Sequence, residues 1–307
     1  MKLPLSGLLE NLSKKKFPYD IDIVLEGGCM NGAYELGGLV LLKEMEKRGN
    51  IKVNRLSGAS VGALLSVLYA VNKLDRYRRI YKKWRRIFNE SVQLKKLERF
   101  TMKVCMKMSD DTFKSLQKNK IFITYYDAEA LRCIVIKEYA TKKELAESVL
   151  KSCHIPYLIN GEPFLKIRDE VCLDGGVPYI FKTRDYESSK VLYMKLACLS
   201  KLGMMFNISG EENLDSRILE GLLDTYNFLM WEGDTEMCSF VDGWGISNIM
   251  RYNSMRYIYK SLVYIFVFSH RFIKHITPYM ERNSICSKLK PGFCVLYKDL
   301  IRYMVFN

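Results

Sequence analysis

The residues with the clearest chemical potential lie around Ser60, in the run Gly58-Ala59-Ser60-Val61-Gly62. This Gly-x-Ser-x-Gly pattern stands between an apolar run that ends at Leu56 and a run of small and apolar residues from Val61 to Ala70. It is typical of a nucleophile elbow, in which a strand ends, the chain turns sharply and a helix begins behind the serine. Glycines flank the serine because larger side chains would clash in so tight a turn. The pattern therefore predicts a serine at a helix N-terminus, where N–H groups favour developing negative charge.

Two further turns combine glycine with polar residues. The first, Glu26-Gly27-Gly28-Cys29-Met30-Asn31-Gly32, directly follows an apolar run at 21–25 that is typical of a buried strand. The second, Asp174-Gly175-Gly176, follows another short apolar run at 170–173. On its own, each pattern is typical of a tight loop. Their order along the chain, on either side of the elbow, is what makes them informative.

The elements that must position these turns alternate between strands and helices. Apolar runs predict strands at 21–25, 53–56, 120–127, 164–167, 170–173 and 191–199. Helical spacing predicts helices at 36–47, 61–70, 142–152, 214–231 and 252–276. This order predicts an α/β fold with a parallel sheet and helical crossovers, followed by a helical C-terminal portion. We expect the aromatic residues of 252–276 to complete the core; alternatives are that this helix covers the site or docks on a membrane.

The chain is strongly basic, with 48 Lys and Arg against 34 Asp and Glu and a formal net charge of +14. Such an excess favours an anionic partner. Residues 73–100 concentrate basic side chains and carry an apolar stripe at helical spacing, formed by Leu74, Tyr77, Tyr81, Trp84 and Phe88. This segment predicts one basic amphipathic helix that docks on the core through the stripe. It is also our candidate for a lid helix or for peripheral contact with an anionic membrane, through residues 73–99. No nucleic acid partner is expected, since no recognised binding module accompanies the charge.

Cysteine and histidine usage argues against disulfide scaffolding and against a metal. The nine cysteines are odd in number and form no CxxC pair, so we interpret them mainly as reduced core thiols. The three histidines belong to no metal-ligand pattern, and no cofactor is expected. The N-terminus does not resemble a signal peptide, and no apolar run is long enough to span a membrane. We therefore expect an intracellular protein, either cytoplasmic or peripherally bound to a membrane.

Taken in order, the three turns closely resemble the motifs of the patatin-like phospholipase family over about residues 18–200. The resemblance implies a three-layer sandwich with a central, mostly parallel sheet and a nucleophile elbow. It divides the chain into a basic leader (1–17), a patatin-like catalytic core (18–200) and a helical C-terminal portion packed on the core (201–307).

The same resemblance assigns roles to the motif residues. It implies a lipid acyl hydrolase of phospholipase A type that needs no cofactor and acts through a Ser-Asp dyad. Ser60 would be the nucleophile and Asp174 the base. Gly27, Gly28 and Cys29 would form the oxyanion hole. The supporting glycines would be Gly32, Gly58, Gly62, Gly175 and Gly176.

The chain departs from the family at two positions of the oxyanion loop. Cys29 stands where a third glycine is usual, and Asn31 stands where a basic residue is usual. These changes motivate an alternative, a catalytically weak patatin-like protein that binds a membrane or a partner. A further alternative is acyl transfer to an alcohol instead of water.

A Ser-Asp-His triad would instead recruit His270 or His275. We interpret both of these histidines as structural. We interpret His154, at the predicted end of the helix 142–152, as structural or pocket-lining.

Overall fold

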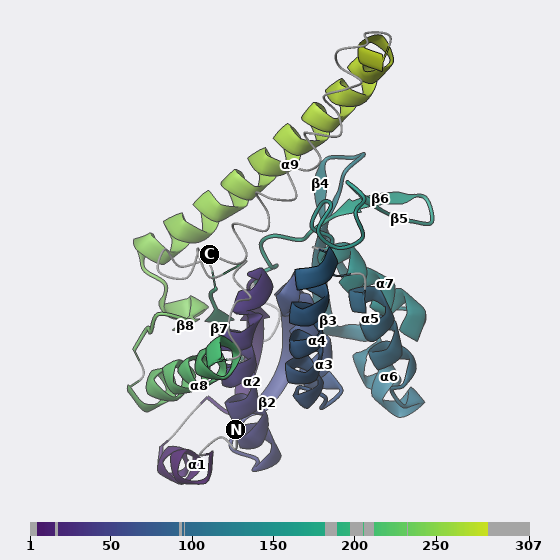
Figure 1. Ribbon diagram of the computed structural model, residues 1–307. Helices are drawn as coiled ribbons and strands as arrows, with labels where there is room; N and C mark the ends of the chain where they lie inside the picture. Colours follow the sequence, from purple (N-terminus) through teal and green to yellow (C-terminus); the bar gives the residue numbers. More distant parts are fainter. Residues whose placement is uncertain are drawn as a thin grey trace.

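The computed structural model describes residues 5–15, 18–91, 94, 96–181, 189–196, 205, 212–231 and 233–281 of the 307-residue chain. Its centre is an eight-stranded sheet in the order β5-β6-β3-β2-β1-β7-β8, with β4 paired to β3 (Figure 1). The strands are β1 (Asp20–Leu25), β2 (Lys52–Ala59), β3 (Lys118–Asp127), β4 (Arg132–Glu138), β5 (Leu165–Ile167), β6 (Glu170–Leu173), β7 (Lys190–Met194) and β8 (Cys238–Phe240).

The four central strands β7, β1, β2 and β3 are parallel, as the α/β pattern predicted. The outer strands β4, β6, β5 and β8 pair antiparallel. The parallel register aligns Leu25 of β1 with Gly58 of β2, so the turn after β1 and the serine turn after β2 lie at the same edge of the sheet. The strand expected at 191–199 ends at Met194, and 197–199 lie outside the described residues.

Alternating side chains divide the sheet between two layers. Ile21, Ile23 and Leu25 of β1 point into the larger core, which is completed by helices. Val24 points the other way, toward a smaller cluster formed with residues 179–181 and Tyr252. On the same side as Val24 lies a buried ion pair, in which Arg55 of β2, stacked over the Phe181 ring, contacts Asp22 of β1 at 2.6 Å. The fold is therefore the three-layer α/β arrangement expected from the sequence.

The larger core is covered mainly by α2 (Gly32–Lys47), α3 (Val61–Ala70), α7 (Lys142–Ser152) and α8 (Glu212–Trp231). Helix α1 (Leu5–Ser13), within the expected leader, packs Leu9 and Leu12 against this core. Helix α6 (Asp110–Leu116) precedes β3. Helix α2 begins at Gly32, earlier than the expected residue 36, so the glycine-rich turn leads directly into it.

The basic segment 73–100 is not one helix, and that prediction was wrong. It forms α4 (Asp75–Ser91) and α5 (Lys96–Met106), with Leu94 buried between them. The amide of Leu94 donates to the carbonyl of Leu158 at 2.9 Å, an interaction that a continuous surface helix would not permit. The apolar stripe of α4 does dock on the core, because Tyr77, Tyr81 and Trp84 are buried. The side chain of Phe88 lies outside the described residues.

The C-terminal helix α9 (Ile246–Glu281) is 36 residues long and projects past the rest of the domain (Figure 1). The expectation that its aromatic residues complete the core was only partly right. Tyr259, Tyr264 and Phe266 are half-buried against the domain, whereas other aromatic side chains of the helix face solvent.

The described residues contain neither a membrane-spanning helix nor a cluster of metal ligands. None of the helices in this part of the chain is long and apolar enough to cross a membrane. Likewise, the described His, Cys, Asp and Glu side chains form no group of three that could hold a metal ion.

Candidate active site

Ser60 lies at the turn between β2 and α3 in a strained backbone conformation, with φ +54° and ψ −126°. The turn is so tight that a Cβ atom on Gly58 would lie 2.4 Å from the carbonyl of Gly62. A Cβ atom on Gly62 would lie 2.5 Å from the carbonyl oxygen of Leu25. Such contacts are impossible for larger residues, so both glycines of the Gly-x-Ser-x-Gly pattern are required by close packing. This geometry is that of a nucleophile elbow.

Two side chains at the end of α7 brace the elbow. The Ser60 amide donates to Oγ of Ser152 at 2.9 Å, and this hydroxyl donates in turn to the carbonyl of Thr124 at 2.6 Å. The thiol of Cys153 donates to the carbonyl of Ser60 at 3.0 Å. Ser152 is fully buried, so these bonds have no competition from water. They hold both backbone groups of the strained serine.

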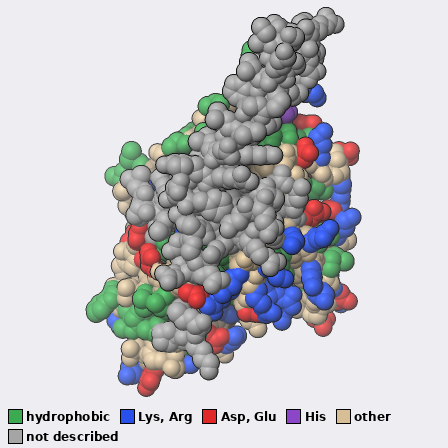
Figure 2. All heavy atoms as spheres, viewed as in Figure 1, with side chains coloured by type: hydrophobic (Ala, Val, Ile, Leu, Met, Phe, Trp, Pro, Cys, Tyr) green, Lys and Arg blue, Asp and Glu red, His purple; other side chains and the backbone are tan. Residues whose placement is uncertain are grey.

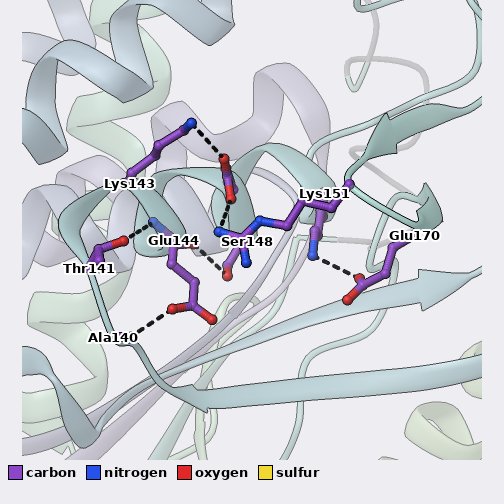
Figure 3. Close-up of polar contacts among 9 residues, drawn as sticks. Ala140, Thr141, Lys143, Glu144, Ser148, Lys151 and Glu170 are labelled. Carbon is purple, nitrogen blue, oxygen red and sulfur yellow. Dashed lines mark hydrogen bonds and ion pairs between the residues drawn. The ribbon is translucent and has the colours of Figure 1, made fainter.

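Helix α7 is itself fixed at both ends (Figure 3). At its start, Oγ1 of Thr141 accepts from the amide of Glu144 at 3.1 Å, and the Glu144 carboxylate accepts from the amide of Ala140 at 2.8 Å. The two bonds cap the first turn of α7 much as a capping box does, except that Glu144 accepts from the residue before the N-cap. Near its end, Lys151 pairs with Glu170 of β6 at 2.7 Å. The last turn of α7 is therefore held firmly where it meets the elbow.

The same turn of α7 positions the Asp-Gly-Gly loop. The amide of Asp174 donates to the carbonyl of His154 at 2.9 Å, and the amide of Gly175 donates to the carbonyl of Ser152 at 3.0 Å. A Cβ atom on Gly175 would lie 2.0 Å from the carbonyl oxygen of Thr124, so the loop approaches β3 at a distance that only glycine permits. Serine turn and aspartate loop are thus tied to one helix end.

The Asp174 carboxyl is buried beside the serine. Its Oδ1 accepts from the amide of Gly176 at 2.8 Å, while Oδ2 has no regular hydrogen-bond partner among the described residues. Burial raises the pKa of Asp174 to about 6, although the Ser60 hydroxyl, the Gly176 amide and the Tyr259 hydroxyl all act to lower it. A carboxylate of this kind is a stronger base than one in water and remains ionised at pH 7.

The glycine-rich turn after β1 reaches the same place. A Cβ atom on Gly27 would lie 3.1 Å from Cβ of Ser60 and 2.8 Å from the carbonyl oxygen of Gly176. The amides of Met30 and Asn31 donate to Met205 and Gly28, respectively. Within the described part of the chain, we see no acceptor for the amides of Gly28 and Cys29. The structure therefore brings together all three turns that the sequence singled out.

Cys29 and Asn31, the two departures from the family pattern, occupy distinct environments. Cys29 has a positive φ of +48°, which explains why glycine is usual at this position. Burial, with a contribution from the charge of Asp174, raises the pKa of the Cys29 thiol, so it stays protonated. Asn31 is fully buried at the start of α2. Neither change removes a backbone N–H group.

A narrow apolar cavity of about 50 Å³ opens beside Ser60. Its walls include Leu64 of α3, Trp84 of α4, Leu97 of α5 and Leu158. The cavity is therefore closed by the two basic helices, whose buried faces supply apolar lining. The outer faces carry exposed Lys and Arg side chains, and Figure 2 shows such side chains gathered over this part of the molecule.

Helix α9 contacts the site from the opposite layer. The Tyr259 hydroxyl donates to the backbone carbonyl of Asp174 at 2.8 Å, and a Cβ atom on Gly176 would lie 2.4 Å from the Tyr259 ring. Arg251 donates to both oxygens of Glu26 at 3.0 Å, and Glu26 directly precedes the glycine-rich turn. Sequence reasoning missed both residues, and it missed the bracing role of Ser152.

The imidazoles of His270 and His154 are not part of this geometry. The His270 ring packs edge-on against Phe164 at 5.0 Å and lines a separate groove of about 570 Å³, whose described lining does not include Ser60 or Asp174. His154 is fully buried, and burial lowers the pKa of its imidazole to about 4, so it is neutral at pH 7. Its backbone carbonyl holds the Asp174 loop, which fits the structural interpretation.

Comparison with known proteins agrees with the geometry. The family model described as patatin-like phospholipase matches residues 23–179, a range that covers just over half of the chain and contains all three turns. A search of curated proteins gave no significant match. The chain belongs to the patatin-like phospholipase family.

Proposed function

We propose that the protein hydrolyses acyl esters of phospholipids, as a phospholipase A-type enzyme, through a dyad of Ser60 and Asp174. Membership of the family supports lipid acyl hydrolysis in general. The observation that carries the specific proposal is the convergence at Ser60. The strained serine, the buried carboxyl with one unpaired oxygen and the glycine turn with unpaired amides all meet there.

In the first step, Oγ of Ser60 attacks the ester carbonyl carbon while Asp174 accepts the hydroxyl proton. The developing oxyanion is stabilised by the backbone amides of Gly28 and Cys29. Collapse of the tetrahedral intermediate breaks the ester bond, and Asp174 returns the proton to the leaving alcohol. Water then attacks the acyl-serine in the same way and releases a free fatty acid.

The surroundings of the serine suit an acyl chain. Apolar lining beside Ser60 favours a hydrocarbon over a polar substrate. A cavity of about 50 Å³ is too small for a long acyl chain, so we infer that α4 and α5 move apart when substrate enters. Exposed basic side chains on these helices, including Lys82, Lys83 and Arg99, favour an approach to anionic headgroups.

The alternative proposal is a catalytically weak protein that binds a membrane or a partner. It is favoured by the non-glycine residue Cys29 at φ +48° in the oxyanion loop and by the absence of a basic side chain at Asn31. Acyl transfer to an alcohol uses the same intermediate and differs only in the final acceptor.

The test is fatty-acid release from phospholipid vesicles by the wild type, Ser60→Ala, Asp174→Asn and a His270→Ala/His275→Ala double variant, with folding checked for each. The proposal expects activity to fall by about a thousandfold or more in both dyad variants and to persist in the histidine variant. No release by a well-folded wild type from several lipids would favour the binding protein. Loss of activity in the histidine variant would favour a triad.

A further inference from the structure

The outer face of α9 presents large apolar side chains to solvent over most of the helix. Each of these side chains is between 47% and 78% exposed. Together they form a continuous apolar surface, unlike the single apolar residues that are scattered over ordinary protein surfaces. Three of them, Ile258, Ile265 and Phe272, recur every seven residues and so lie along one stripe. The full set is Ile246, Ile249, Met250, Tyr257, Ile258, Leu262, Ile265, Phe268, Phe272 and Ile273.

The opposite face of α9 is already occupied. Val263 and Val267 are buried in a cluster with Tyr126 and Leu173 of the sheet. The Tyr252 hydroxyl donates to the carbonyl of Pro178 at 3.0 Å, which adds to the contacts of Arg251 and Tyr259 with the candidate active site. The helix therefore cannot roll to hide its apolar stripe without breaking these contacts.

Charge on α9 has one sign. Between Ile246 and Met280 the sequence contains five basic residues and no acidic residue. Four of the five, Arg256, Lys260, Arg271 and Lys274, are exposed. Helical spacing places these four on the side of α9 away from the stripe, as in helices that lie in a membrane interface. A partner that covers the stripe and also reaches these side chains must accept apolar side chains and carry negative charge. An anionic phospholipid surface does both, because apolar side chains enter the acyl region while Lys and Arg reach the headgroups.

The same charge argues against two other occupants. A second copy of α9 would add five basic residues and no acidic residue beside the five already there, so it offers no complementary charge. The C-terminal residues 282–307 also contain five basic residues and one acidic residue, so they offer no charge complementarity.

We propose that the outer face of α9 docks on an anionic phospholipid bilayer and thereby holds the Ser60 site at the lipid surface. This inference rests on the proposed function for its biological purpose, but the docking itself is independent of turnover. It adds an apolar anchor, from the opposite layer of the fold, to the basic helices α4 and α5.

The test measures partitioning of the full chain onto vesicles of phosphatidylcholine, alone or mixed with phosphatidylserine. The variant is Ile258→Gln/Ile265→Gln/Phe272→Gln, in which glutamine preserves helix propensity. The matched control is Tyr19→Gln/Leu223→Gln/Trp231→Gln, which removes three exposed apolar side chains from the turn before β1 and from α8. Since each lost apolar side chain costs about tenfold in partitioning, we expect the α9 variant to bind mixed vesicles at least about a hundredfold more weakly, and the control to bind like the wild type.

Equal binding by the wild type and the α9 variant would overturn the proposal. Loss of self-association in the α9 variant, with vesicle binding retained, would overturn it in favour of a second copy. Hydrolysis of a soluble short-chain ester without vesicles separates the two claims: it should be equal in all three proteins, and its absence in the wild type would count against the proposed function alone.

A reporter variant keeps the test decisive if the triple variant folds poorly. Ile265→Trp places an indole on the stripe, and Leu223→Trp places one on α8. Docking predicts a blue shift of the added fluorescence on mixed vesicles for Ile265→Trp only. An equal response of the two variants, or none from Ile265→Trp, would contradict the proposal.

Discussion

Replacing Ser152 by alanine tests whether the end of α7 holds the nucleophile elbow. The hydroxyl accepts from the Ser60 amide and donates to the Thr124 carbonyl, so its removal leaves two buried backbone groups without partners. Each unsatisfied buried group costs about 1–3 kcal/mol, so we expect Ser152→Ala to lower the free energy of unfolding by about 2–4 kcal/mol. The strained φ of Ser60 also loses its brace, so kcat/KM for a soluble ester should fall at least about tenfold.

Ser148→Ala is the matched control for this variant. Ser148 is buried on the same helix, but its hydroxyl donates only to the carbonyl of Glu144, one turn earlier, at 2.8 Å. Its removal leaves no backbone group without its helical partner, so we expect a loss within about 1 kcal/mol and unchanged kcat/KM. Denaturant unfolding and ester kinetics on both variants give the comparison. Equal losses for the two serines would refute the bracing role.

Four further predictions concern the Asp174 loop. Because the folded pKa of Asp174 is raised to about 6, kcat/KM should fall about tenfold per pH unit below pH 6; an acid limb near pH 4 would contradict this. The raised pKa also means that ionised Asp174 costs stability above pH 6. Asp174→Asn, although inactive, should therefore be more stable than the wild type by up to about 3 kcal/mol at pH 8 in a thermal melt, and equal or lower stability would argue against a desolvated carboxylate. Tyr259→Phe removes a hydroxyl that lowers this pKa, so the acid limb should move to higher pH, by less than about one unit; an unmoved limb would limit Tyr259 to packing. Gly175→Ala should inactivate or unfold the protein because its Cβ would overlap the Thr124 carbonyl, whereas Gly245→Ala meets open space and should be tolerated; equal expression and activity of both would show that the loop can shift.

The meeting of the three turns was implied only by the family resemblance, whereas the residue pattern itself predicted the parallel strands and the helices α3 and α7. These features are local, because apolar periodicity and glycine spacing report directly on strands, helices and tight turns. The positions of Ser60 and Gly27 then follow from the parallel register, which brings the ends of β1 and β2 to one edge. Asp174 follows β6, which pairs antiparallel with β3, so its place beside Ser60 does not follow from that register. Whether these residues catalyse a reaction stays a prediction.

Long-range contacts were not predictable in the same way. Ser152 contacts Ser60 across 92 residues of chain, and Arg251 contacts Glu26 across 225. A serine in the last turn of an ordinary helix carries no local signal of such a role. The one available signal was the clustering of Ser152, Cys153 and His154 at a helix end followed by proline.

Two predictions failed because apolar spacing alone does not say what covers a stripe. The basic segment 73–100 breaks into two helices, since burying Leu94 outweighs helical continuity there. Tyr257, Phe268 and Phe272 of α9 are exposed rather than part of the core, because the domain contacts only one face of a helix that carries apolar residues on two.

The most direct test of the proposed mechanism is labelling by a fluorophosphonate, which reacts only with an activated serine, followed by intact-mass measurement and peptide mapping. The Ser60–Asp174 dyad predicts a single adduct on Ser60, none in Ser60→Ala and labelling at least about a hundredfold slower in Asp174→Asn. An unlabelled, well-folded wild type, or an adduct on another residue, would contradict the dyad.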